Sequence, residues 1–245
     1  MPVKKKKRYK SIFFDLDNTI WDFNTNSYEA LKIAFKKNNL HEFIPDFNDF
    51  YNTYEVINTQ LWGSYRNKGI SKSRLIIERF GKTFDTFGLS HDALNFNNDY
   101  LQAMPGQKAL VDNAFEVLEY LKGKGYQLFI ITNGFKEVQL KKLEQSGLAH
   151  YFIRIFISEE VKSHKPDKVI FEHALKSSNS RKQSSLMVGD SWEVDVLGAL
   201  NAGIDQVHFN FGGGDSISEE EREYIRYSRT ATYRINNLKQ LKLFL

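Results

Sequence analysis

The chain begins, after a short polar stretch, with an apolar run that does not alternate with polar residues. Ile12, Phe13 and Phe14 are consecutive, which indicates a strand buried on both faces, as in a parallel sheet. The run stops at Asp15, and a second acid follows at Asp17. Because the carboxyl ends of strands face the ligand crevice in open α/β sheets, these acids are placed for chemistry. A surface turn is the alternative, since Asp, Asn and Thr are common turn residues.

The pattern then becomes helical and remains so until Met104-Pro105-Gly106, which interrupts it. Two stretches carry apolar side chains at helical spacing, and further helices are expected at 73–80 and 92–103. The apolar positions are Tyr28, Leu31, Ala34 and Phe35 in the first stretch, and Phe47, Phe50, Tyr51, Tyr54, Ile57, Leu61 and Tyr65 in the second. We therefore expect a helical domain at 22–104, inserted after the first strand.

From residue 105 onward, expected strands and helices alternate. The strands are expected at 127–132, 153–158, 185–189 and 206–209, and the helices at 108–122, 136–146, 166–176 and 193–202. Pro166 is expected at the first position of its helix, where its missing N–H is tolerated. Alternation of this kind indicates a parallel, doubly wound sheet. We predict an α/β core at 11–21 and 105–245, and Gly212-Gly213-Gly214 suggests a flexible loop after the last strand.

Charge changes this picture only at the N-terminus. The net charge is +4, and six of the 34 basic residues lie in the first ten positions, which contain no acid. The remaining 28 basic side chains face 30 acidic ones, so the basicity belongs to a tail at 1–10. Such a tail could bind nucleic acid or act as a nuclear address. We favour a solvated, flexible terminus and expect no nucleic-acid partner.

Cysteine and hydropathy narrow the class of protein further. The chain contains no cysteine, which excludes disulfides and thiolate metal sites. No run approaches the ~18 apolar residues of a membrane span, and the apolar run after the basic tail is too short for a secretory signal. We expect a soluble cytoplasmic protein without a membrane partner, either a monomer or a homodimer.

Polar side chains follow the expected core strands where these strands end. They are Asp15 and Asp17, Thr132 with Asn133, and Asp190, with Asp195 in the next helix and Lys165 before a helix start. A parallel sheet would bring these positions to one edge. Taken singly, each has an ordinary alternative: Thr132 as a helix cap, Lys165 as a surface lysine, and Asp190 and Asp195 as acids near a helix N-terminus.

Taken together, these residue types suit phosphoryl transfer. Carboxylates are preferred Mg²⁺ ligands, and a lysine and a hydroxyl can bind phosphate oxygens. One carboxylate can attack phosphorus while a second carries the proton. We interpret the set as a phosphoryl-transfer site.

The motifs that contain these residues resemble those of the haloacid dehalogenase superfamily. They are Asp15-Leu16-Asp17-Asn18-Thr19, Ile131-Thr132-Asn133-Gly134, Lys165-Pro166-Asp167, and Gly189-Asp190-Ser191 through Asp195. The resemblance covers the chain after the basic tail and implies a Rossmann-like core with a helical cap domain. It also implies a phosphatase or phosphomutase rather than a dehalogenase, because dehalogenases of this superfamily lack the second acid, here Asp17.

The resemblance implies a role for each motif residue. Asp15 would be the nucleophile, and Asp17 would be the general acid and then the general base. The implied ligands of Mg²⁺ are Asp15, the backbone carbonyl of Asp17, Asp190 and, as an additional or water-mediated ligand, Asp195. The residues that would bind the phosphoryl group are Thr132, Asn133 and Lys165.

The sequences flanking these motifs resemble a narrower group, the bacterial 5'-nucleotidases that dephosphorylate pyrimidine and noncanonical nucleoside monophosphates. The segments are Thr19-Ile20-Trp21-Asp22-Phe23, Ile131-Thr132-Asn133-Gly134-Phe135, Ile157-Ser158-Glu159-Glu160-Val161 and Asn201-Ala202-Gly203. Phe23 and Trp62 could then stack a base, whereas Tyr65 continues the apolar stripe of its helix and is expected to pack in a core.

Two other functions stay open at this stage. The chain could be a phosphatase or phosphomutase that acts on a small sugar phosphate or a phosphoglycolate-like metabolite. It could also be a phosphate-responsive binding module without catalysis, although such a module would have no need for both Asp15 and Asp17.

Overall fold

The computed structural model describes residues 9–211 and 218–245, so most of the expected basic tail and Gly212-Gly213-Gly214 lie outside the described residues. The chain divides into two compact units. The α/β unit ends its first segment at Asp22 and also contains 110–140 and 147–245, and the helical unit contains Phe23–Ala109 and Lys141–Ser146. The second division thus falls at 109/110, whereas the sequence pattern placed it at 104/105. No helix of the described ranges has the length and hydropathy needed to cross a bilayer.

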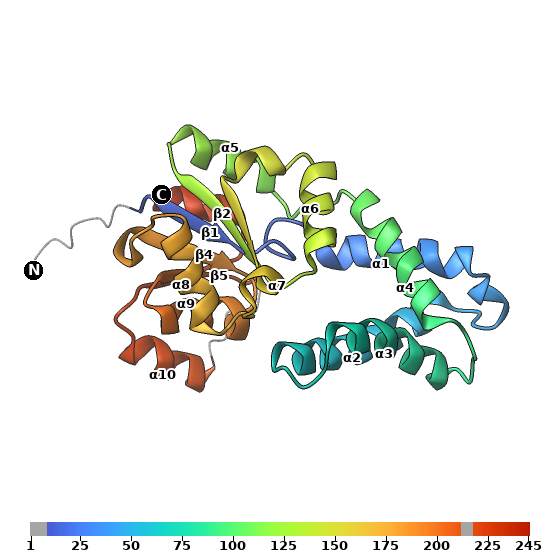
Figure 1. Cartoon of the computed structure of the whole chain (residues 1–245). Helices are drawn as coiled ribbons and strands as arrows, with labels where there is room; N and C mark the ends of the chain where they lie inside the picture. Colours follow the sequence, from blue (N-terminus) through green and yellow to red (C-terminus); the bar gives the residue numbers. More distant parts are fainter. Residues whose placement is uncertain (1–8, 212–217) are drawn as a thin grey trace, which may run out of the picture. The chain divides into compact units, whose positions relative to one another are not determined.

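A six-stranded, fully parallel sheet forms the centre of the α/β unit (Figure 1). Its strand order is β3-β2-β1-β4-β5-β6. The strands are β1 (Ser11–Phe14), β2 (Gln127–Thr132), β3 (Arg154–Ile157), β4 (Ser185–Gly189), β5 (Asp205–Phe209) and β6 (Thr232–Ile235). The expected α/β fold class is confirmed, and β1 lies between β2 and β4.

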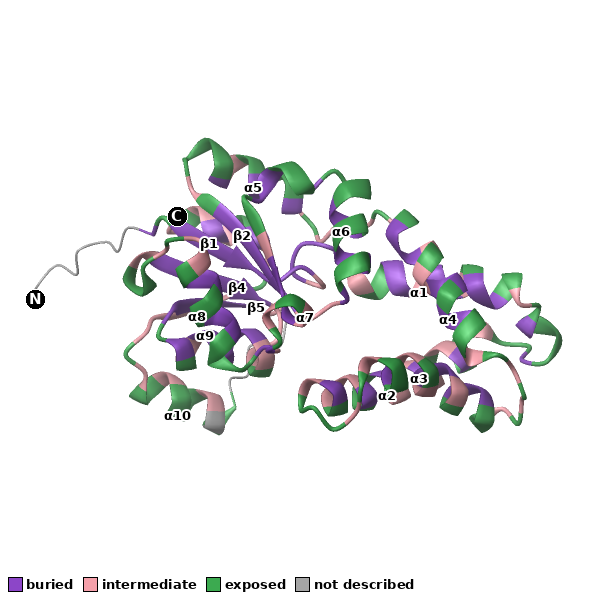
Figure 2. Cartoon of the chain, in the orientation of Figure 1, coloured by how far each residue is buried: buried purple, intermediate pink, exposed green. Residues whose placement is uncertain are grey.

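Helices cover both faces of this sheet. Phe13, Phe129 and Met187 form one apolar cluster with α8 (Lys168–Ser177) and α9 (Leu197–Ala202). Phe14 points to the opposite face, where its ring lies 6.4 Å from that of Phe152. Figure 1 shows α5 (Ala114–Gly123) on the side of the sheet away from α8 and α9, and the strands between these layers are largely buried (Figure 2). The core is therefore doubly wound.

The helical unit consists mainly of α1 (Phe23–Lys37), α2 (Phe47–Arg66), α3 (Lys72–Thr86) and α4 (Ala93–Ala103). Side-chain caps mark three helix starts, at Asp46, Ser71 and Asp92, as expected for residues that accept hydrogen bonds from orphan N–H groups. Aromatic residues fill the interior: Phe50, Tyr54, Phe80, Phe84, Phe96 and Tyr100. Their rings pack edge-to-face or stacked, which contributes beyond burial alone.

The remaining elements of the described ranges are shorter or lie outside these layers. They are α6 (Lys136–Gln145), α7 (Ser158–Val161), α10 (Glu219–Tyr227), a π-helical turn (Trp192–Val196), and short 3₁₀ segments at Leu40–Glu42, Met104–Gly106, Ala149–Tyr151, Lys182–Ser184 and Leu238–Leu243.

The expected helix at 108–122 is wrong over 108–113, because α5 begins only at Ala114. The preceding backbone forms hydrogen bonds with the segment after β1 instead. The Val111 amide donates to the Ile20 carbonyl at 3.0 Å, and the Ala109 amide donates to the Asn26 side chain at 2.9 Å. These long-range bonds replace the helical ones.

Two further expectations need correction. Pro166 does not open a helix; Asp167 is the cap of α8, its side chain accepting from the Val169 amide at 3.0 Å. The strand at 205–209 is not the last one, because β6 pairs with it. β6 lies at the sheet edge and is only partly buried, so it lacks the continuous apolar run that identifies central strands.

Candidate active site

Three neighbouring strands end at the same edge of the sheet and carry the motif residues. Asp15 follows β1, Thr132 ends β2, and Asp190 follows β4. The Asp15 amide continues the ladder by donating to the Val188 carbonyl at 2.9 Å. Residues distant in sequence are therefore brought together by the strand order alone.

A cluster of carboxylates lies at this edge. Asp15, Asp190 and Asp195 each present one oxygen within 4.8 Å of the others. Asp195 comes from the π-helical turn after β4, whose start is capped by Ser191. Gly189 allows this approach, because a Cβ at Gly189 would lie 2.4 Å from Asp195 side-chain atoms. These hard oxygen donors fit a divalent cation such as Mg²⁺.

Lys165 brings a positive charge into the cluster. Its side chain is buried, and Nζ lies 2.5 Å from Asp15 Oδ1 and 2.6 Å from Asp195 Oδ1. Asn133 holds the lysine backbone: its Nδ2 donates to the Lys165 carbonyl and its Oδ1 accepts from the Lys165 amide, both at 2.9 Å. The Asn133 amide, expected to bind phosphate, thus engages the Lys165 backbone at both of its ends.

Burial and the neighbouring charges shift the protonation equilibria of this cluster. Burial raises the pKa of the Asp15 carboxyl well above its ordinary value; Lys165 opposes the shift, whereas the nearby acids reinforce it. Burial and the Asp195 charge raise the pKa of Asp190 to about 7. Burial lowers the pKa of Lys165, but Asp15 and Asp195 outweigh it and leave the pKa above its usual range. Positive charge, such as that of Lys165, is therefore what favours the ionised form of Asp15 and Asp190.

Asp17 and Thr132 share one hydrogen-bond donor that the sequence analysis missed. Gln139 of α6 donates from Nε2 to Asp17 Oδ2 at 2.9 Å and to Thr132 Oγ1 at 2.7 Å. Thr132 Oγ1 also accepts from the Gly134 amide at 3.1 Å. A buried glutamine one helical turn into α6 was the available signal, but its partners cannot be inferred from spacing.

Thr19 is a second residue to which the sequence analysis assigned no role. Its buried hydroxyl accepts from the Asp190 amide at 3.0 Å and donates to Asp190 Oδ1 at 3.3 Å. The hydroxyl therefore orients the carboxyl of Asp190 toward the cluster, as a supporting partner of a ligand should.

The segment after β1 is a tight turn as well as part of the site. Asn18 has a φ of 59°, a left-handed conformation that asparagine tolerates better than most residues. The Ile20 and Trp21 amides both donate to the Leu16 carbonyl, at 3.0 and 2.9 Å. The two interpretations of this segment are thus compatible, because the turn presents Asp15 and Asp17.

The two expected base-stacking residues, Phe23 and Trp62, belong to the helical unit. The Lys142 ammonium lies 5.1 Å from the centre of the Phe23 ring. Trp62 is half-buried and packs edge-on against Tyr65, which is buried as its stripe requires. Base stacking by Phe23 and Trp62 stays a prediction.

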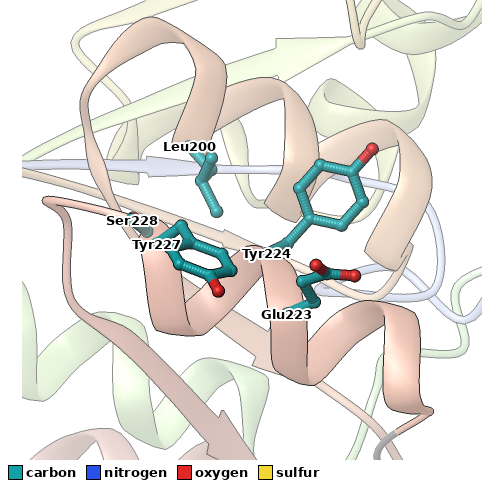
Figure 3. Close-up of a pocket in the computed structure, with 5 residues that line it drawn as sticks. All are labelled: Leu200, Glu223, Tyr224, Tyr227 and Ser228. Carbon is teal, nitrogen blue, oxygen red and sulfur yellow. The ribbon is translucent and has the colours of Figure 1, made fainter.

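A separate surface pocket of about 440 Å³ lies in the α/β unit, between α9 and α10. Figure 3 shows its labelled lining, with Tyr224 and Tyr227 on α10 and Leu200 on α9; Glu223 and Ser228 complete it. The lining contains none of the motif residues, so this pocket is not the catalytic centre.

The fold and the site define the class of protein. A doubly wound sheet presents two acids, a buried lysine and a carboxylate cluster at one edge, and this combination is the machinery of an enzyme that hydrolyses phosphoric monoesters.

Comparisons with known proteins support this class of enzyme. Residues 9–203 match the model of the haloacid dehalogenase-like hydrolases, and the chain belongs to this family. It is 33% identical over 221 residues to the pyrimidine 5'-nucleotidase PynA of Streptococcus pneumoniae, covering 90% of this chain and 92% of PynA. It is 35% identical over 194 residues to the pyrimidine 5'-nucleotidase YjjG of Escherichia coli, covering 79% and 82%.

A solved structure is also similar over nearly the whole chain. The HAD-hydrolase YfnB of Bacillus subtilis, determined bound to magnesium, aligns with a TM-score of 0.84 at 28% identity and covers 97% of this chain and 98% of its own. The expected family is therefore confirmed, and the non-catalytic binding module is disfavoured.

Proposed function

We propose that this enzyme is a Mg²⁺-dependent 5'-nucleotidase that hydrolyses pyrimidine nucleoside monophosphates through an aspartyl-phosphate intermediate. The single observation that carries the catalytic part is the contact of buried Lys165 with both Asp15 and Asp195, within a cluster of carboxylates. The nucleotide part rests on the pyrimidine 5'-nucleotidase relatives. The cytoplasmic location expected from the sequence stays a prediction.

The first chemical step transfers the phosphoryl group to the protein. An Asp15 carboxylate oxygen attacks phosphorus and forms the new P–O bond, while the bond from phosphorus to the ester oxygen breaks. Asp17 gives its proton to that ester oxygen, so the nucleoside leaves as a neutral alcohol. Lys165 offsets the negative charge of the phosphoryl oxygens, and the Thr132 hydroxyl donates a hydrogen bond to one of them. Thr132 is suited to donate because its oxygen already accepts two hydrogen bonds.

The second step regenerates the enzyme. Asp17, now ionised, removes a proton from a water molecule whose oxygen attacks phosphorus. The bond between phosphorus and the Asp15 oxygen breaks, inorganic phosphate leaves, and Asp15 returns to a carboxylate. Asp17 keeps the proton for the next cycle, so the protons and bonds balance over one turnover.

The donor set of the carboxylate cluster fits Mg²⁺. Asp15, Asp190, Asp195 and the backbone carbonyl of Asp17 would hold the ion. When bound, Mg²⁺ supplies positive charge that offsets the phosphate and the clustered acids. Thr19 would keep Asp190 oriented, and Asn133 would keep Lys165 in place through its backbone.

A panel of phosphate esters tests this proposal. Uridine and thymidine 5'-monophosphates, purine 5'-monophosphates, ribose 5-phosphate and glycerol phosphate are compared by kcat/KM, with Mg²⁺ and with EDTA. We expect the pyrimidine nucleotides to be preferred and EDTA to abolish turnover. Preference for a sugar phosphate would refute the nucleotidase assignment, and full activity in EDTA would refute the metal dependence.

A further inference from the structure

One side-chain amide connects the proton-carrying acid to the phosphate-binding hydroxyl. Gln139 is fully buried, and its Nε2 lies 2.9 Å from Asp17 Oδ2 and 2.7 Å from Thr132 Oγ1. Its two N–H bonds therefore serve two different functional groups. All three residues belong to the α/β unit.

The chemistry of the partners determines which end of the amide faces them. An ionised carboxylate only accepts hydrogen bonds, so the amide nitrogen must face Asp17. Among the described residues, Gln139 Oε1 is buried without a hydrogen-bond partner. A buried, unpartnered oxygen costs stability, so an apolar side chain of similar shape would serve packing better. This indicates a functional rather than a structural reason for glutamine.

The backbone leaves room for this side chain. A Cβ at Gly134 would lie 2.4 Å from Gln139 Nε2 and 2.5 Å from its Cδ. The φ angle of Gly134 is not positive, so the backbone conformation at this position does not require glycine. The space above Gly134 is instead occupied by the Gln139 amide.

We propose that Gln139 is a positioning residue that determines which oxygen of Asp17 carries the catalytic proton. A donor on Oδ2 makes that atom the carbonyl oxygen of the protonated acid, so the proton resides on Oδ1. The same amide also donates to Thr132 Oγ1, but the Gly134 amide donates to that oxygen as well, so phosphate binding by Thr132 does not depend on Gln139 alone. The inference rests on the proposed function, since it assumes Asp17 as the proton carrier.

The consequence differs between two kinds of ester. The leaving group of an alkyl ester, such as a nucleoside 5'-monophosphate, is a strongly basic alkoxide unless Asp17 protonates it. The leaving group of 4-nitrophenyl phosphate, an aryl ester of an acidic phenol, is a stable anion that needs little protonation. Loss of Gln139 should therefore slow the first ester much more than the second.

The test compares Gln139→Met with Gln145→Met, the same change at an exposed position of the same helix. Single-turnover rates of phosphoryl transfer are measured with enzyme in excess, on thymidine 5'-monophosphate and 4-nitrophenyl phosphate. We expect Gln139→Met to slow the alkyl ester by about tenfold to a hundredfold, with a small change on the aryl ester and no fall in Tm. Gln145→Met should match the wild type. Equal losses on both esters, or none, would overturn the inference.

A second variant reaches the same contact from the other side. Gly134→Ala should displace the Gln139 amide and reproduce the selective loss on the alkyl ester, with Gly123→Ala, where a Cβ meets no atom within 4 Å, as its control. If both Gln139→Met and Gly134→Ala are unfolded, the inference is also overturned, because the contact then stabilises the fold rather than positioning Asp17. If the wild type hydrolyses neither ester, the proposed function fails; if it hydrolyses both and the variants keep its ratio of rates, only this inference fails.

Discussion

The buried ammonium of Lys165 lies 2.5 Å from Oδ1 of Asp15, although 150 positions separate the two residues in the chain. The lysine also contacts Asp195, so one cation sits between two acids. This contact makes the charge balance of the site depend on a single side chain, because removing one partner of a buried ion pair leaves the other charge uncompensated.

Substituting Lys165 should make the fold depend on Mg²⁺. In Lys165→Met the clustered acids lose their buried cation, so we expect a loss of about 3 kcal/mol or more in unfolding free energy without metal. Mg²⁺ should recover part of this loss, because it binds the native cluster and not the unfolded chain. The Tm measured with and without Mg²⁺ checks this. The exposed Lys168→Met is the control, and equal Mg²⁺-induced shifts in Lys165→Met and the wild type would contradict the prediction.

Replacing the nucleophile should stop the chemistry and preserve the fold. Asp15→Asn keeps the shape of the side chain but removes the charge that attacks phosphorus, so we expect kcat/KM to fall by at least about a thousandfold. Circular dichroism should remain that of the wild type. Asp85→Asn, at an exposed position of α3, should keep full activity. Normal phosphate release by Asp15→Asn would exclude the proposed mechanism.

Gly189→Ala should weaken the metal site without replacing any of its ligands. The new Cβ would lie 2.4 Å from atoms of the Asp195 side chain, so Asp195 must move away from the cluster. We expect Mg²⁺ affinity to fall by about tenfold or more, measured by calorimetry. Gly106→Ala adds the same atom where nothing lies within 4 Å and should bind Mg²⁺ as the wild type does. Unchanged affinity in Gly189→Ala would show that Asp195 is not needed.

The helical unit should lose stability in acid through Asp99. Burial raises the pKa of this carboxyl, but hydrogen bonds from Lys37 and Asn38 outweigh it and leave the pKa below its ordinary value. Such a group stabilises the fold above the unfolded pKa of about 4 and loses this contribution as pH falls through the folded value.

Asp99→Asn should therefore be less stable than the wild type by about 1 kcal/mol at pH 7. The difference should shrink as pH falls below the unfolded pKa of about 4 and through the lower folded pKa, because the wild-type carboxyl then becomes protonated too. Urea unfolding at several pH values measures this, with the exposed Asp85→Asn as the control. A difference that stays constant with pH would rule out the ionised carboxylate as the cause.

Local sequence patterns determine much of the core. The strands at 127–132 and 185–189 have the expected bounds, because central parallel strands are buried on both faces and are therefore continuous apolar runs. The partly buried edge strand β6 lacks such a run and was missed. The polar helix α10 was missed as well, although Ser218 and Glu221 form a capping box at its start.

The sequence by itself determined the order of the motifs, the parallel core and the residue types available for phosphoryl transfer, because strand ends and helix starts are encoded locally. Only the tertiary structure decided which side chains meet. It placed Lys165 between Asp15 and Asp195, turned Asn133 toward the Lys165 backbone, and joined Gln139 to Asp17 and Thr132. These contacts link residues from different elements, and their geometry follows from how the chain packs, which no local pattern of apolar and polar residues records.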